Sequence, residues 1–191
     1  MAYPWEETMS SASSPAPSSD PIVVSDVVKR FGDLTALDHV TLSVARGETF
    51  GLIGPNGSGK TTLIRLLLGL SRPTDGRIAV LGRAMPDRRV APRIGYMTQS
   101  SALYNELSVR ENLAFFGTLY GLRGKRLRER LAATLELVDL TERANSPVQT
   151  LSGGMRQRVS LGCALIHEPE LIFLDGVRRH ADMPPEGGHS H

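Results

Sequence analysis

The chain has 191 residues, 40% of them hydrophobic and 22% charged, with a formal net charge of +2. These values are ordinary for a globular protein with an apolar core, and the length allows one domain with a small inserted subdomain. The charge is too small to indicate nucleic acid or a membrane surface as a partner. Cys163 is the only cysteine, which excludes an intramolecular disulfide and favours a reducing compartment.

No apolar run approaches the ~18 residues needed to span a bilayer. The N-terminus has neither the basic region nor the apolar region of a secretory signal. We therefore predict a cytoplasmic protein whose contact with a membrane goes through a partner. Residues 1–20 are rich in Ser, Pro and Ala without periodicity, which predicts a disordered extension.

Strand patterns dominate the first half of the ordered region. Apolar residues at 22–28 and 40–44 predict two strands, and a short apolar run at 49–53 predicts a buried strand that leads into a glycine-rich loop. Leucines at helical spacing predict a helix over 61–70, which Gly69 and Pro73 end. Residues 77–81 and 93–97 have the pattern of two further strands.

The pattern becomes helical after residue 105. Ser108 and Glu111 predict a capping box for a helix that carries Leu113, and a second amphipathic helix follows with leucines every four residues from Leu127. We predict a helical insert at about 105–150, a helix over 153–167 and a buried strand over 170–174. Together these define a domain over 21–175, followed by an irregular tail over 176–191.

The sequence from Gly54 to Thr61 reads GPNGSGKT, which matches the phosphate-binding pattern G-x-x-x-x-G-K-[ST]. Glycines let several backbone N–H groups converge on a phosphate, and the following helix adds the positive end of its dipole. Lys60 is expected to reach the outer phosphates, and the Thr61 hydroxyl to hold Mg²⁺. Asp175 ends an apolar strand, where a second Mg²⁺ contact is expected beside such a loop.

The order of further motifs along the chain indicates a protein family. After the loop come Gln99 behind a short strand, the helical insert, Leu-Ser-Gly-Gly-Met at 151–155, and the strand that ends at Asp175. In this order the chain resembles the nucleotide-binding domain of ATP-binding cassette (ABC) transporters over residues 22 to 175. The segments around Gln99 and Ser108 look most like bacterial exporters of the ABC-2 type.

The resemblance implies an α/β fold: a P-loop NTPase core with a mainly parallel sheet, an N-terminal antiparallel portion and an inserted helical subdomain, incomplete at the C-terminus. It implies that Phe31 stacks on adenine and that Gln99 contacts Mg²⁺ and couples the site to a membrane partner. It also implies that residues 152–154 contact the γ-phosphate of ATP on a second subunit. The implied nucleotide-binding residues are Phe31, Gly54, Pro55, Asn56, Gly57, Ser58, Gly59, Lys60, Thr61, Thr62, Gln99, Ser152, Gly153 and Gly154, and the implied Mg²⁺ ligands are Thr61, Gln99 and Asp175.

This resemblance implies an energy-coupling ATP-binding subunit with ATP and Mg²⁺ as its ligands. Its partners would be a transmembrane permease subunit and a second ABC subunit, identical or paired, with no nucleic acid. It would be peripheral on the inner face of the cell membrane.

The sequence departs from the family directly after Asp175. The family has a glutamate there that polarises the attacking water, whereas this chain has Gly176, and the motifs that follow in the family are not recognisable. General-base catalysis is worth about 10²–10⁴ in rate, so a full-length protein with this change would bind ATP and turn it over poorly. The sequence thus leaves the catalytic residue unknown. The loss of apolar pattern after Asp175 suggests a truncated or frame-shifted reading of a longer protein.

Besides the transporter subunit, two alternatives stay open. One is a truncated cassette that binds ATP without hydrolysing it, and the other is a soluble ABC protein that acts on ribosomes or DNA. The basic run over 123–130 has no interleaved aromatics, which favours a solvated helix face over a nucleic-acid site. Cys163 is expected to be a small buried apolar residue rather than a nucleophile.

Overall fold

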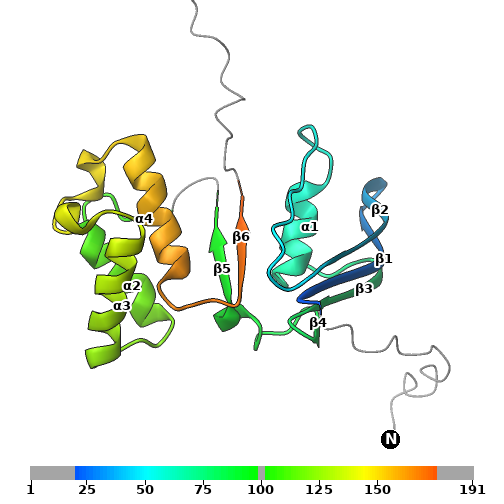
Figure 1. Ribbon diagram of the computed structural model, residues 1–191. Helices are drawn as coiled ribbons and strands as arrows, with labels where there is room; N and C mark the ends of the chain where they lie inside the picture. The colour runs from blue at the N-terminus through cyan, green and yellow to red at the C-terminus, as the bar shows by residue number, and fades with distance from the viewer. Residues whose placement is uncertain (1–19, 99–101, 176–191) are drawn as a thin grey trace, which may run out of the picture. The chain divides into compact units, whose positions relative to one another are not determined.

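A computed structural model describes residues 20–98 and 102–175. These residues divide into two compact units, one on each side of the Asp87–Arg88 bond. Among the described residues, no helix is long and apolar enough to cross a membrane. The first unit is mainly an antiparallel sheet with one helix, and the second contains a parallel strand pair and a group of helices (Figure 1).

The sheet of the first unit has the order β2–β1–β3–β4, with all neighbours antiparallel. Its strands are β1 (Ile22–Phe31), β2 (Leu34–Val44), β3 (Asp75–Val80) and the short β4 (Arg83–Ala84). β1 and β2 form a hairpin through the turn at Gly32 and Asp33, and Phe31 pairs with Leu34. The expected strands at 22–28, 40–44 and 77–81 are confirmed, and β2 begins earlier than the apolar pattern indicated.

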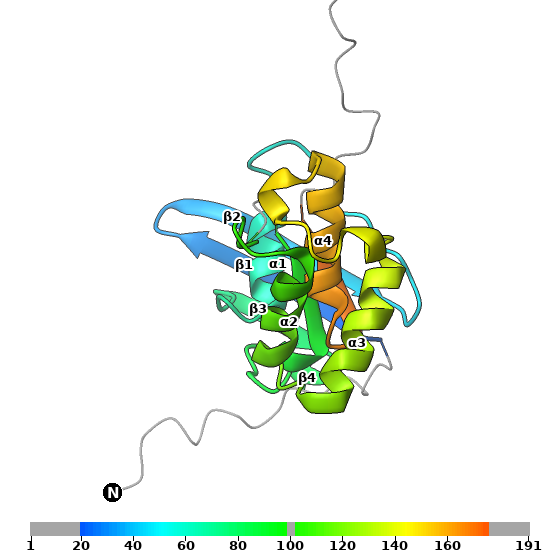
Figure 2. The same cartoon turned by 90° about the vertical axis from the view of Figure 1, so that its left-hand side faces the viewer.

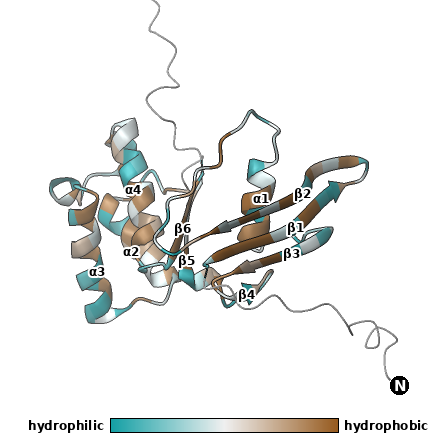
Figure 3. Ribbon diagram, turned by 45° about the vertical axis from the view of Figure 1, so that its right-hand side comes forward, coloured by the Kyte–Doolittle hydropathy of each residue, from teal (hydrophilic) through white to brown (hydrophobic). Residues whose placement is uncertain are grey.

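Helix α1 (Lys60–Leu67) packs on this sheet and supplies the other half of its core. Apolar residues line the strands, and α1 lies against one face of the sheet (Figure 3). Leu66 of α1 and Val27 and Val80 of the sheet are completely buried. The helix stops near Gly69, whose φ of +71° suits a residue without a side chain and confirms the expected end.

The expected buried strand at 49–53 is wrong. Residues 48–55 have no regular secondary structure, and Phe50, Leu52 and Ile53 are exposed, Ile53 to 84%. An apolar run forms a buried strand only where neighbouring strands accept its backbone hydrogen bonds. Within the described residues no strand pairs with this segment, so its apolar composition is not matched by burial.

In the second unit, β5 (Ile94–Met97) and β6 (Leu171–Leu174) pair in parallel, with Ile94 opposite Leu171. Both strands were expected, but the burial predicted for β6 is only partly correct. Phe173 is buried whereas Leu174 is 50% exposed. A parallel strand is buried when other elements cover both its faces and both its edges. Among the described strands β6 pairs only with β5, so it lacks neighbours as residues 49–53 do.

The other described residues of the second unit include three α-helices, which Figure 2 labels. They are α2 (Val109–Leu119), α3 (Gly124–Leu137) and α4 (Gly153–Leu165), and the 3₁₀ turns are η2 (Ala91–Arg93), η3 (Thr141–Arg143) and η4 (Val148–Thr150). The predicted capping box is confirmed: the Ser108 hydroxyl accepts a hydrogen bond from the Glu111 N–H, and the Glu111 carboxylate accepts one from the Ser108 N–H. The Ser108 hydroxyl also donates a hydrogen bond to the Glu111 carboxylate, and this bond, together with the one from the Ser108 N–H, lowers the pKa of Glu111.

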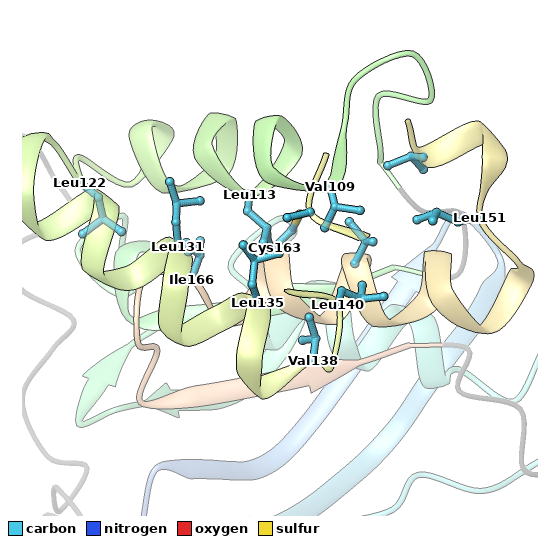
Figure 4. Close-up of a cluster of buried hydrophobic side chains, with 13 residues drawn as sticks. Val109, Leu113, Leu122, Leu131, Leu135, Val138, Leu140, Leu151, Cys163 and Ile166 are labelled. Carbon is cyan, nitrogen blue, oxygen red and sulfur yellow. The ribbon is translucent and has the colours of Figure 1, made fainter. Parts of the chain in front are cut away.

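The apolar faces of these helices meet in one cluster (Figure 4). Leu113 from α2, Leu135 from α3 and Cys163 from α4 lie in it together with Ile166. Burial raises the pKa of the Cys163 thiol to about 12, so the thiol is neutral at physiological pH. The prediction that Cys163 acts as a buried apolar residue agrees with this environment.

Leu113 and Leu119 provide a matched pair for testing this core. They lie on the same helix, but Leu113 is fully buried whereas Leu119 is 68% exposed. We expect Leu113→Ala to lower the free energy of unfolding by about 2–5 kcal/mol, because it removes buried carbon atoms and leaves a cavity. Leu119→Ala should change it by less than about 0.5 kcal/mol. Urea denaturation of the two variants measures both values, and equal losses would contradict the described packing.

Candidate nucleotide site

The phosphate-binding pattern forms an exposed loop that leads directly into α1. Residues 54–58 are exposed, and Gly57 and Gly59 have φ angles of +83° and +85°. These are left-handed conformations that a residue with a side chain rarely adopts. The glycines at these two positions are therefore required by the curvature of the loop.

Gly59 also lies against the β2 strand. A Cβ atom at this position would be 2.5 Å from the backbone oxygen of Ala36 and 2.8 Å from Cδ2 of Leu37. Only a residue without a side chain allows the loop to approach the hairpin so closely. The loop and the β1–β2 hairpin are therefore held together at one point of direct backbone contact.

The Lys60 side chain is folded back across the loop. Its ammonium group donates hydrogen bonds to the backbone oxygens of Gly54 and Pro55, both at 2.7 Å, and to the Ser58 hydroxyl at 3.2 Å. An ammonium group has three donors, so all three hold the loop in its curved form. The positive charge of Lys60 therefore lies against the loop, where it would attract an anion.

The start of α1 adds to this attraction. The Leu63 N–H donates to the Gly59 oxygen and closes the first helical turn, while the N–H groups of Lys60, Thr61 and Thr62 precede any acceptor within the helix. The first turn contains no acidic residue. Free N–H groups, a positive helix end and a lysine fit a phosphate group, and the Thr61 hydroxyl fits a magnesium ligand.

Phe31 lies at the tip of the β1–β2 hairpin, and its side chain is 53% exposed. This exposure fits a ring that is available to a ligand, and it excludes Phe31 from the core of the described fold. The Lys29 ammonium lies 4.8 Å from the centroid of the ring. Both residues belong to the same unit as the phosphate-binding loop.

Asp175 directly follows β6, and its N–H donates to the Met97 oxygen at 2.8 Å. The strand pair is parallel, so the end of β6 and the end of β5 lie at the same edge. Gln99 comes two residues after Met97 but lies outside the described residues. Asp175 is half-buried, and in the described ranges no group of three His, Cys, Asp or Glu side chains could hold a metal.

The segment 152–154 begins helix α4. The Ser152 hydroxyl accepts a hydrogen bond from the Met155 N–H and caps the helix. Gly153 and Gly154 are exposed, and a Cβ atom added to either would meet no atom of the chain within 4 Å. Packing among the described residues therefore does not require a glycine at either position.

The two glutamates that precede β6 are engaged by arginines. Glu170 accepts two hydrogen bonds from Arg93, at 2.6 and 2.9 Å, and Glu168 accepts one from Arg130 at 3.0 Å. Both lie at the end of β6 opposite to Asp175. In the basic run over 123–130, Arg130 is partly buried and the other basic residues are exposed, and Lys125 and Arg126 form ion pairs with Glu129 and Glu168.

The sequence profile of the ABC transporter family matches residues 37–177 of this chain. The chain belongs to the ABC transporter family. Among curated relatives, the daunorubicin resistance ATP-binding protein DrrA3 of Streptomyces coeruleorubidus is 47% identical over 156 residues, which are 81% of this chain and 49% of that protein. The Nod factor export ATP-binding protein I of Sinorhizobium fredii is 43% identical over 166 residues, 84% of this chain and 48% of that protein.

A third relative is the probable multidrug ABC transporter ATP-binding protein YbhF of Escherichia coli, 41% identical over 161 residues, which are 83% of this chain and 28% of that protein. The chain therefore spans about half or less of the length of these relatives. Solved structures agree with the fold. CbiO1 of Clostridium perfringens, part of an ABC transporter complex, has a TM-score of 0.77 at 25% identity and covers 83% of this chain and 66% of its own.

An ATP-binding cassette of an ABC transporter in its ADP conformation has a TM-score of 0.72 at 28% identity, covering 81% of this chain and 68% of its own. The P-loop NTPase fold with antiparallel and parallel sheets is thus confirmed. The family binds nucleotide, typically with Mg²⁺. Phe31 and the phosphate-binding loop lie in the first unit, and Asp175 and residues 152–154 lie in the second.

Sequence reasoning missed Lys29. The only available signal was its position two residues before Phe31, which places both side chains on the same face of a strand. It also missed the contact of Gly59 with Ala36, because nothing in the loop pattern says which strand lies beside it.

Gly57 and Gly59 allow the loop contact to be tested. Both glycines have left-handed φ angles, but a Cβ atom at Gly57 would meet nothing whereas one at Gly59 would meet the Ala36 oxygen. We expect Gly59→Ala to lower the free energy of unfolding by about 1–3 kcal/mol more than Gly57→Ala does, because only the former adds overpacking to the strain. Thermal denaturation measures the difference. Equal losses would show that the contact with β2 is unimportant.

Proposed function

We propose that this chain is the ATP-binding, energy-coupling part of an ABC transporter that exports its substrate through a separate transmembrane protein. The observation that supports this most directly is the Gly54–Thr62 loop, with Lys60 at its centre and the open N-terminus of α1 behind it. The names of the curated relatives, which include drug resistance and Nod factor export proteins, support the direction of transport.

In this proposal the loop residues 54–62 hold the phosphates, and Phe31 stacks on the adenine. Thr61, Gln99 and Asp175 hold Mg²⁺. Thr61 and Asp175 fit this role because hydroxyl and carboxylate oxygens are the ligands that Mg²⁺ prefers. Bound Mg²⁺ would neutralise charge on the phosphate oxygens.

Residues 152–154 would contact the γ-phosphate of ATP held by a second ABC subunit, identical or paired. The support is the pair of exposed glycines, which nothing within the chain requires, at a helix start with no acidic residue in its first turn. A helix N-terminus with this composition attracts an anion. ATP would thus join two subunits, and their closure would act on the membrane partner from the inner face of the membrane.

A second candidate function is ATP binding without turnover. It is favoured by Gly176, which stands where the family has its water-polarising glutamate and lies outside the described residues. The neighbouring Glu168 and Glu170 are paired with arginines and lie at the far end of β6, so neither fits the role of a substitute base. A soluble ABC protein that acts on ribosomes or DNA is the remaining alternative, and co-purification with membranes rather than with ribosomes or DNA separates it from a transporter subunit.

Lys60 and Lys125 form the matched pair for the main test. We expect Lys60→Ala to weaken Mg·ATP binding by about 10- to 100-fold, because it removes charge-assisted hydrogen bonds. Lys125→Ala removes the same charge from an exposed site on α3 and should leave the affinity unchanged. Isothermal titration of the purified chain measures this, and equal effects of the two variants would contradict the proposed site.

Steady-state hydrolysis on the same samples decides between the two candidates. Binding that depends on Lys60 without turnover favours the binding-only cassette. Turnover that depends on Lys60 favours the energy-coupling subunit and requires a base other than residue 176.

Gly153→Asp tests the role of the α4 start. The space around Gly153 is open, and an acidic residue near a helix N-terminus is stabilising, so the melting temperature should be unchanged or slightly higher. Affinity of the single subunit for ATP should also be unchanged. ATP-dependent dimerisation, followed by light scattering, should be lost because the new carboxylate repels the γ-phosphate. A variant that still dimerises with ATP would overturn this part of the proposal.

A further inference from the structure

Lys29 and Phe31 form a fixed pair at the end of strand β1. Residues two apart on a strand point to the same face, and the Lys29 ammonium lies 4.8 Å from the centroid of the Phe31 ring. A cation at this distance over an aromatic face is attracted by the electron density of the ring. The Phe31 ring is nevertheless 53% exposed, so it remains accessible to a ligand.

The Lys29 side chain is itself held from a distant part of the chain. Its ammonium donates a hydrogen bond to the backbone oxygen of Arg72 at 2.8 Å. Two residues later, the Thr74 N–H donates to the Val28 oxygen at 2.8 Å, and the Thr74 hydroxyl accepts from the Arg30 N–H at 2.9 Å. The segment between α1 and β3 is thus fastened along the end of β1, and Lys29 connects it to the Phe31 ring.

This arrangement restricts the motion of an exposed aromatic side chain. An exposed ring at a hairpin tip would otherwise lose conformational freedom when a ligand stacks on it, and that loss weakens binding. Contact with a side chain that is anchored to a backbone oxygen restricts the ring before the ligand arrives. The contact lies within one compact unit, which also holds the phosphate-binding loop.

We propose that Lys29 is a positioning residue for the nucleobase, which holds the Phe31 ring in the orientation that the base stacks on. The inference rests on the proposed function, in which Phe31 stacks on adenine. It differs from a phosphate-binding role for Lys29, because the ammonium acts on the ring and not on the nucleotide.

The test compares two ligands, Mg·ATP and Mg·tripolyphosphate, of which only ATP has a base. We expect Lys29→Met, which keeps a long unbranched side chain but removes the charge, to weaken ATP binding by about two- to fivefold. Tripolyphosphate binding should not change. Phe31→Ala should weaken ATP binding by about fivefold or more, and adding Lys29→Met to Phe31→Ala should have no further effect, because the two residues act as one unit.

Three controls separate this effect from general ones. Lys125→Met makes the same chemical change at an exposed site on α3 and should leave binding of both ligands unchanged. Arg72→Ala should also have no effect, since only its backbone oxygen is used. Lys29→Arg keeps the cation and should retain most of the ATP affinity, and melting temperatures of all variants report any loss of folding.

The outcomes are distinct. An equal loss of ATP and tripolyphosphate binding in Lys29→Met would overturn the inference, because it indicates a phosphate contact or a damaged loop. Unchanged ATP binding in Lys29→Met would overturn the inference as well. The proposed function would remain intact in that case, provided that the wild-type chain binds ATP and Lys60→Ala weakens this binding. Failure of the wild-type chain to bind either ligand would overturn the proposed function and the inference with it.

Discussion

The close approach of Gly59 to the backbone oxygen of Ala36 is the constraint on which the first unit depends. It joins the two parts of that unit that hold the proposed nucleotide-binding residues. One is the loop with Lys60, and the other is the β1–β2 hairpin with Phe31 at its tip. Because a side chain at residue 59 would collide with the Ala36 oxygen, only a glycine there lets the phosphate-binding loop approach the hairpin this closely. Lys60 also holds the loop, because its ammonium group donates all three of its hydrogen bonds to atoms of the loop.

A similar contact organises the second unit. A Cβ atom at Gly95 on β5 would be 2.4 Å from the backbone oxygen of Ala164 on α4, so the strand and the helix touch directly. His167, just beyond the helix, contacts the Ile94 oxygen at 3.1 Å through its Nε2 atom, and burial lowers the pKa of this histidine. The neutral ring fits this setting, and its Nε2–H would be the donor. These two contacts therefore position β5, which pairs with the strand that leads to Asp175, against α4, which begins after Ser152.

Local signals in the sequence predicted the elements that depend on neighbours within a few residues. The Ser108–Glu111 capping box and the helix after the glycine loop are of this kind, since both caps and helical spacing act within one or two turns. Contacts across long stretches of chain could not be predicted in the same way. Residues 49–53 have the composition of a buried strand but no neighbour within the described residues. The hydrogen bond between Lys29 and the Arg72 oxygen joins residues 43 positions apart, and no pattern in either segment indicates the other.

The acidic side chains around β6 lie at opposite ends of the strand. Glu170 accepts two hydrogen bonds from Arg93 at the start of the parallel strand pair. The four residues of β6 separate it from Asp175. At about 3.3 Å per residue along a strand, this places it more than 10 Å from the edge where Asp175 lies. Moving it there would break both hydrogen bonds and the strand register they accompany. Asp175, the proposed magnesium ligand, and the two glutamates that precede β6 thus lie at opposite ends of the strand, so neither glutamate fits the role of a substitute base.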